Sequence, residues 1–167
     1  MSKARKIAFS ALLAAVLFVA QVALSFLPNI EVVSILVIVS AVVFGRLTLV
    51  SIYAFALLEG LCYGFGIWWL NYCYVWAILY GIARALRRRE SSFFWAVASG
   101  AFGLSFGCLC AIPYGLAGGF YAGLSYWISG LPFDILHCVG NFVTALVLFR
   151  PLKHACCHIG RMLGLSK

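Results

Sequence analysis

Long apolar stretches, separated by short polar breaks, occupy most of the chain. Six of them lie at about residues 7–27, 30–44, 47–64, 67–86, 92–116 and 131–149. A helix needs roughly 20 apolar residues to cross a hydrocarbon core of about 30 Å, and most of the stretches are near that length. The sequence therefore predicts an all-α integral membrane protein in which residues 1–167 form one domain of six transmembrane helices.

The composition excludes a soluble domain. Apolar residues make up 65% of the chain and charged residues only 10%, far from the balance of soluble proteins. The net charge of +8 would suggest nucleic-acid binding in a soluble protein. Here the cations cluster at the ends of the apolar stretches, where they can meet anionic lipid headgroups. We therefore predict a lipid bilayer as a partner and no nucleic acid.

The twelve Lys and Arg residues all fall on one side of this six-helix arrangement. They precede the first stretch or follow the second, fourth and sixth, whereas the breaks after the first, third and fifth stretches contain none. Basic residues are retained on the cytoplasmic side of a membrane. Both termini are therefore predicted to be cytoplasmic, and the breaks around Pro28, Gly66 and Gly123 to face outwards.

Sequence motifs for metal and nucleotide chemistry are missing. The seven cysteines form no Cys-x-x-Cys pair and no zinc-ligand spacing, so no metal site and no cofactor are expected. The chain also lacks a Gly-x-x-x-x-Gly-Lys-Ser/Thr phosphate loop. It is therefore not expected to hydrolyse ATP by that route, or to be an enzyme.

Two apolar stretches carry small residues at helical spacing. The first stretch and the residues just before it place four alanines on one helical face: Ala4, Ala8, Ala11 and Ala15. The fifth has a comparable line of glycines: Gly100, Gly103 and Gly107. Small residues let another helix approach closely in a membrane. The glycines are expected to pack inside the bundle, whereas the alanines could pack there or dock a partner protein.

Three of the four carboxylates, Glu31, Glu59 and Asp134, lie toward the predicted outer side, where no Lys or Arg is expected. An acid at membrane depth is costly and usually faces a cavity, a partner charge or a substrate. We therefore take all three as candidate ligand-binding residues. Glu31 and Asp134 could instead cap helices, with Asp134 opening the sixth span, and Glu59 could hydrogen-bond a neighbouring helix.

Aromatic residues are concentrated around the same outer breaks. They are Tyr63, Trp68, Trp69, Tyr72, Tyr74, Tyr121, Tyr126 and Trp127. Aromatic belts at a bilayer interface account for some of them. Aromatic faces beside carboxylates also suit a flat heterocycle with hydrogen-bond donors, which would be both stacked and paired.

The sixth stretch carries a polar row. Asp134, His137, Cys138 and Asn141 follow one another at i, i+3, i+4 and i+7, so an acid, an imidazole and an amide share one helical face. A lone histidine would be explained by packing alone. The complete row indicates a binding site.

These features resemble the S components, the substrate-binding membrane subunits of energy-coupling factor (ECF) vitamin transporters. The resemblance covers essentially the whole chain and implies an S-component-like bundle in the bacterial cytoplasmic membrane. Besides size and topology, it rests on the pair Ala11-x-x-x-Ala15, the turn Leu27-Pro28-Asn29-Ile30-Glu31 and the segment from Pro132 to Phe142.

The resemblance also implies a division of labour. The chain would capture a micronutrient near the outer face, then dock through Ala8, Ala11 and Ala15 on a transmembrane coupling protein driven by two ATPase subunits. The implied substrate-binding residues are Asn29, Glu31, Trp68, Trp69, Asn71, Tyr126, Trp127, Asp134, His137 and Asn141. Glu59 and Tyr63 are further candidates for substrate binding, because they belong to the outer acids and aromatics.

The chemistry of these residues favours a neutral or cationic ligand. A guanine-like base offers adjacent N–H donors to one carboxylate, and an attached amine would match a second. A deazaguanine precursor of queuosine fits best, and some S components are assigned to such precursors. Riboflavin, thiamine and cobalamin remain open, whereas the anionic folate and pantothenate fit poorly.

Two other classes of protein are weighed against this one. A small metal- or proton-coupled carrier could use Glu59, Asp134 and His137. An intramembrane enzyme could use Asp134, His137 and a cysteine such as Cys138 or Cys110. Cys138 follows His137 directly, so on a helix the two side chains point about 100° apart, which is poor geometry for a catalytic pair.

Overall fold

The computed structural model describes residues 2–164, and 85% of the chain is helical with no strand in the described part. The helices are α1 (Lys3–Ala23), α2 (Val33–Phe44), α3 (Arg46–Tyr63), α4 (Ile67–Tyr72), α5 (Val75–Ala85), α6 (Ser92–Gly118) and α7 (Phe120–Met162). Four of them, α1, α3, α6 and α7, are long and apolar enough to cross a membrane. The predicted all-α fold is confirmed.

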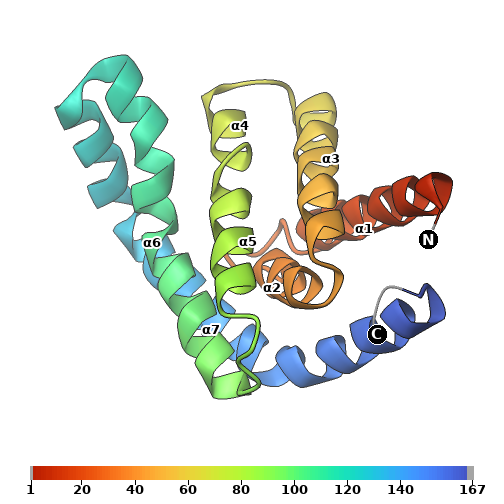
Figure 1. Cartoon of the computed structure of the whole chain (residues 1–167). Coiled ribbons are helices and arrows are strands. Elements are labelled where there is room, and N and C mark those ends of the chain that lie inside the picture. Colours follow the sequence, from red (N-terminus) through yellow and green to blue (C-terminus); the bar gives the residue numbers. More distant parts are fainter. Residues whose placement is uncertain (1, 165–167) are drawn as a thin grey trace.

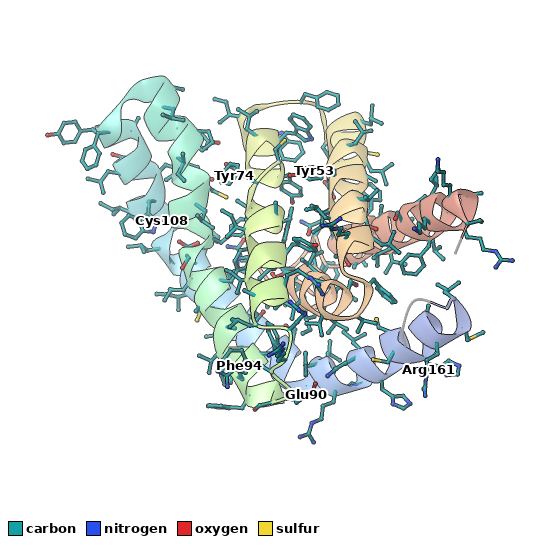
Figure 2. The ribbon with its side chains drawn as sticks, in the orientation of Figure 1. Tyr53, Tyr74, Glu90, Phe94, Cys108 and Arg161 are labelled. Carbon is teal, nitrogen blue, oxygen red and sulfur yellow. The ribbon has the colours of Figure 1, made fainter. Side chains whose placement is uncertain are left out.

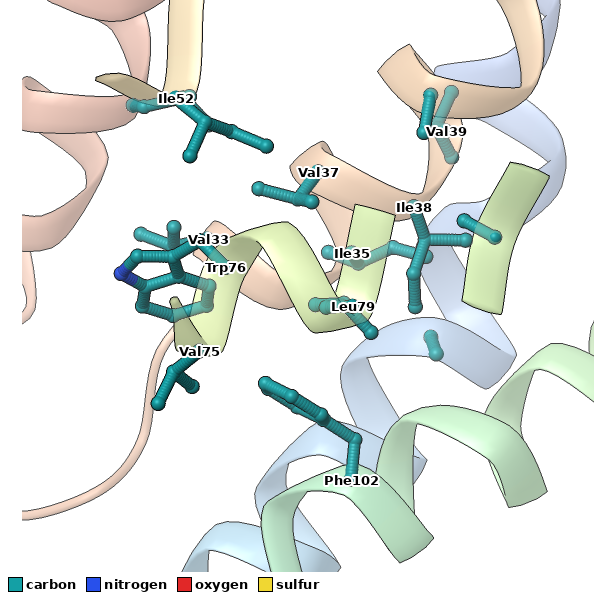
Figure 3. Packing of buried hydrophobic residues seen from close by; sticks show 14 of the residues in the cluster. Val33, Ile35, Val37, Ile38, Val39, Ile52, Val75, Trp76, Leu79 and Phe102 are labelled. Atoms are coloured by element: carbon teal, nitrogen blue, oxygen red, sulfur yellow. The ribbon is translucent and has the colours of Figure 1, made fainter. Parts of the chain in front are cut away.

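Helix α2 lies at the centre of the molecule. Apart from Ser34 and Ser40 it consists of apolar residues, as expected for a helix surrounded by other helices, and it packs against α1, α3, α5 and α7. Figure 3 shows Val33, Ile35 and Val37 of α2 beside Trp76 and Leu79 of α5. These side chains form the core, and the loop that precedes α2 is thereby fixed in place.

Helices α6 and α7 form a long hairpin, which occupies the left of Figure 1. The glycine line of α6 lies in the contact, since a Cβ added at Gly103 would sit 2.8 Å from the backbone carbonyl of His137. At Gly107 it would meet the carboxylate of Asp134. The predicted internal packing of these glycines is therefore confirmed, and it places α6 directly against the polar row of α7.

The face of helix α1 that packs against the core is not the face that carries the alanine line. Ser10, Ala14 and Leu17 are buried, whereas the alanine line of Ala4, Ala8, Ala11 and Ala15 is exposed along its whole length. Packing of these alanines inside the bundle, one of the two interpretations of the sequence, is therefore wrong for this chain.

Four of the six predicted spans match a helix to within a few residues, and two differ in kind. The stretch 67–86 is broken between Tyr72 and Val75, where short i→i+3 hydrogen bonds replace the helical ones. Asn71 lies just before this break, and its side chain lies 3.0 Å from the hydroxyl of Tyr74, just after it.

The stretch 131–149 is only the middle of α7, which has 43 residues. The chain turns at Gly119, whose φ of +86° suits glycine, so the outer turn precedes Gly123, which already belongs to α7. Pro132 lies inside the helix. The expectation that Asp134 opens the sixth span, and could cap it, is therefore wrong, because Asp134 lies more than three turns into the helix.

The helix axes are not all parallel. In Figure 1, α1 and the C-terminal part of α7 run steeply across the direction of α3 and α5. Helix α7 changes direction along its length, and Pro151, which cannot donate a helical hydrogen bond, lies within its C-terminal part.

The two ends of α2 mark two chemically different ends of the molecule. At the C-terminal end of α2, Arg84 donates a hydrogen bond to the carbonyl of Ala41 at 3.2 Å. Lys153 of α7 pairs with Glu90 at the same end of the molecule. Figure 2 shows Glu90 and Phe94 at this basic end, and Tyr74, just before α5, and Cys108 of α6 away from it. The candidate site lies at the opposite end, where the chain enters α2.

Candidate binding site

A cavity of about 380 Å³ lies between the loop that precedes α2 and helices α1, α4, α5, α6 and α7. Six of the twelve residues predicted to bind substrate line it: Asn29, Glu31, Trp68, Asn71, Tyr126 and His137. They come from parts of the chain that are up to 108 positions apart, from Asn29 to His137. The fold thus gathers half of the predicted set in one place.

Glu31 is the acidic centre of the cavity. Its Oε2 accepts the backbone N–H of Ser34 at 2.8 Å, so it satisfies a free donor in the first turn of α2, as predicted for a capping role. Its Oε1 lies 3.3 Å from Nε2 of His137. Each carboxylate oxygen has a second lone pair. Glu31 is therefore oriented by two protein groups and still has acceptor capacity for a ligand.

Asn29 fixes the loop that carries Glu31. Its φ of +54° is in the left-handed region, which asparagine tolerates better than most residues. Its Nδ2 donates to the carbonyl of Phe133 at 3.0 Å, which ties the loop to α7. The turn and the hydrogen bond together bring Glu31 to His137.

Asn71 supplies a buried amide on the opposite wall. It is 4% exposed, and its Oδ1 lies 3.0 Å from the hydroxyl of Tyr74. That hydroxyl is 2.6 Å from the carbonyl of Leu109, which fixes it against α6. The break between α4 and α5 therefore holds the Asn71 side chain at the cavity wall.

Aromatic rings form much of the remaining surface. Trp68 meets Tyr72 edge to face at 5.5 Å, and Tyr72 meets Trp76 at 5.8 Å. On the other side, Tyr126 stacks on Tyr114 at 4.1 Å. Such arrays offer both faces and edges to a flat ligand.

A second cavity of about 330 Å³ adjoins the first and is centred on Asp134. Asp134 is 2% exposed, and its Oδ1 accepts the backbone N–H of Gly107 at 2.9 Å. Its Oδ2 is buried and has no partner in the structure. Asn29, Phe106, Cys110 and Tyr126 line both cavities.

The other predicted site residues lie outside the first cavity. Tyr63 is 57% exposed. Trp69 donates to the carbonyl of Ala56 at 2.7 Å, and Trp127 borders a separate apolar groove. Glu59 is buried in α3 with one unpartnered oxygen. Asn141 donates to the hydroxyl of Ser34 at 3.1 Å and thus supports the first turn of α2 behind the site.

Several cavity residues were not identified from the sequence as site residues: Gln21, Tyr72, Trp76, Phe106 and Cys110. Gln21 is the polar exception in an apolar stretch, and it donates to Tyr72 at 3.2 Å. That exception was a usable signal. Tyr72 belongs to the aromatic group around the outer breaks, whereas Trp76 and Phe106 gave no signal, because a cavity-lining ring and a core ring look alike in a sequence.

Charge and ligand geometry narrow the chemistry of the site. No Lys or Arg of the described residues lines either cavity. Across residues 2–164, no group of three or more His, Cys, Asp or Glu side chains could hold a metal ion, so Glu59, Asp134 and His137 do not form one ligand set. The cavities suit a neutral or cationic molecule that donates hydrogen bonds.

Comparison with known proteins gives no relative: no family model, no curated protein and no solved structure matches the chain.

Proposed function

We propose that the chain is the substrate-binding subunit of an ECF-type importer and that it captures a small, flat, donor-rich heterocycle in the Glu31 cavity. One observation carries the proposal. An acid held between Ser34 and His137 faces a cavity that is rich in aromatic side chains and has no Lys or Arg among the described lining residues. Such an acid selects for N–H donors.

The position of Glu31 suits a guanine-like edge. Two adjacent N–H groups of such a base can be accepted by the two oxygens of one carboxylate. Asn71 on the opposite wall can pair with a further polar atom, and Trp68 and Trp76 provide apolar surface for the ring. These contacts together would fix the orientation of a bicyclic ligand.

Size and charge rank the ligands. A cavity of about 380 Å³ is near the lower end for small-molecule sites, which run from roughly 300 to 1,000 Å³. This favours a deazaguanine precursor of queuosine, with riboflavin and thiamine as further candidates, and makes the bulky cobalamin a poor fit. Anionic vitamins lack a basic partner at this cavity.

The proposed setting is the bacterial cytoplasmic membrane, with six spans and both termini inside. Four helices have the length and hydropathy to span a bilayer. The cationic cluster around Arg84 and Lys153 lies beyond one end of α2, and the Glu31 cavity lies at the other. Basic residues retained on the cytoplasmic side would leave the cavity facing outwards.

The exposed alanine line supports the proposed partner. Ala8, Ala11 and Ala15 present a narrow, small-residue face that no other part of the described chain covers. In a membrane such a face allows close approach of another helix. We assign it to the transmembrane coupling protein, whose two ATPase subunits would drive uptake.

A thermal-shift screen of the detergent-purified chain tests this function. Ligands that bind the folded state raise its apparent stability by mass action. The panel consists of 7-deazaguanines, riboflavin, thiamine, cobalamin and divalent metals. Stabilisation by one heterocycle, lost in Glu31→Gln but kept in Glu90→Gln, is the expected result.

The control, Glu90, is an exposed acid that pairs with Lys153 at the basic end. Stabilisation by metal alone, or by no compound of the panel, would contradict the proposed function.

A further inference from the structure

Asp134 has a carboxylate oxygen that takes no part in the proposed contacts with the heterocycle ring. Its side chain is almost fully buried, yet only Oδ1 has a partner, the N–H of Gly107. The second oxygen, Oδ2, is buried without a hydrogen bond. A buried carboxylate oxygen without a donor is costly, so such a group indicates a missing partner.

No protein donor around this cavity is hydrogen-bonded to Asp134 Oδ2 in the structure. The amide of Asn29 already donates to the carbonyl of Phe133. The hydroxyl of Ser129 lies within hydrogen-bond distance of the carbonyls of Ser125 and Tyr126, to which it donates. Among the described residues, no Lys, Arg or His lines this cavity. The Tyr126 hydroxyl and the Cys110 thiol also line the cavity, but neither is hydrogen-bonded to Oδ2, which leaves that oxygen as an acceptor for a ligand.

The Asp134 cavity is an extension of the Glu31 cavity. Four residues, Asn29, Phe106, Cys110 and Tyr126, belong to the lining of both. His137, which pairs with Glu31, follows Asp134 by three positions on α7. Side chains at that spacing have Cβ atoms about 5–6 Å apart. A substituent of a few bonds on a ring beside Glu31 could therefore reach Asp134.

We propose that the Asp134 cavity binds a short aliphatic ammonium group carried by the heterocycle. The inference rests on the proposed function and narrows its substrate class to heterocycles with a primary-amine arm. Asp134 Oδ2 would accept the ammonium hydrogen, and opposite charges would compensate each other in a poorly solvated place. The ring and the arm would thus be recognised by separate carboxylates, Glu31 and Asp134.

Two matched ligands distinguish recognition of the arm from recognition of the ring. They are 7-aminomethyl-7-deazaguanine and 7-ethyl-7-deazaguanine, which have side arms of similar size and differ in the charged amine. Their affinities are measured by isothermal titration calorimetry with the purified full chain, as wild type and as Asp134→Asn. The asparagine keeps an oxygen for the N–H of Gly107, so the contact between α6 and α7 is preserved.

The wild type is expected to bind the aminomethyl compound at least about tenfold more tightly than the ethyl compound, as a charge-assisted hydrogen bond implies. Asp134→Asn should abolish this preference and leave affinity for the ethyl compound within about threefold of wild type.

Three results would overturn the inference. Equal affinity of the wild type for both ligands would do so and leave the proposed function intact. An equal loss of both ligands in Asp134→Asn would show that Asp134 is structural. Binding of neither ligand to the wild type would refute this inference together with the deazaguanine assignment.

Discussion

Two lines of small residues in this protein have similar helical spacing and opposite environments. The glycine line of α6, Gly100, Gly103 and Gly107, is buried against the backbone and side chains of α7. The alanine line of α1 is exposed from Ala4 to Ala15. A line of small residues therefore indicates that another helix can approach closely, but the line alone does not determine whether that helix belongs to the same chain.

The two lines also differ in their relation to the binding site. Gly103 lies against His137, and Gly107 lies against Asp134. Both partners line the candidate cavities. A change in the glycine line should therefore affect folding and binding together. A change in the alanine line should affect neither in the isolated chain.

The largest effect is expected from Gly103→Leu. Even a Cβ at this position would lie 2.8 Å from the backbone of His137, so the two helices would have to separate. Overpacking of this kind costs roughly 1–3 kcal/mol or more. Thermal denaturation in detergent should show a clearly lower midpoint, or no folded protein.

The matched control is Gly130→Leu, because Gly130 lies on α7 with no atom within 4 Å of its Cβ position. Equal stability of the two variants would show that the glycine line is not a close contact.

A smaller effect is expected from Gly107→Ala. The added methyl group would collide with the carboxylate of Asp134, a side chain that can move, rather than with backbone. The variant should fold, with a moderate loss of stability, and should bind 7-aminomethyl-7-deazaguanine about tenfold more weakly because a charge-assisted contact is displaced.

The affinity for 7-ethyl-7-deazaguanine should change little in this variant, and both values can be measured by calorimetry. Unchanged affinity for the aminomethyl compound would show that the glycine line does not influence ligand binding.

The smallest effect on the isolated chain is expected from Ala11→Trp. Ala11 is exposed, so the thermal midpoint and the ligand affinity should both match wild type. Cellular uptake of the ligand should nevertheless be lost, because a large side chain would block the close approach of the proposed coupling protein.

Ala14→Trp provides the control on the same helix, since Ala14 is 1% exposed and the variant should be strongly destabilised. Normal uptake by Ala11→Trp would remove the docking role from this face.

The sequence predicted the helical class, and it identified Glu31 and Asp134, the acids that line the two candidate cavities. Charge and hydropathy are local properties of a membrane chain. The sequence predicted Glu31 and His137 separately as site residues, but their contact joins positions that are 106 residues apart. Only the packing of α2 against α7 brings them together. No local pattern contains that information.

The sequence did not predict helix bounds that fall inside uniformly apolar segments. The break after Tyr72 and the continuous path through Pro132 both lie within apolar segments, so a length criterion could not place them. Glu59 was an equally good candidate by composition, yet it lies outside the lining of both cavities. The direction of a side chain within a bundle depends on helix rotation, which hydropathy does not fix.

We propose that Glu31 recognises the ring of a heterocyclic ligand. Calorimetric titration of 7-deazaguanine into the purified chain tests it most directly, with wild type, Glu31→Gln and Glu90→Gln compared under identical conditions. We predict that Glu31→Gln binds at least about tenfold more weakly, since charge-assisted hydrogen bonds are lost, and that Glu90→Gln binds like wild type. Equal affinity in all three proteins would contradict the account.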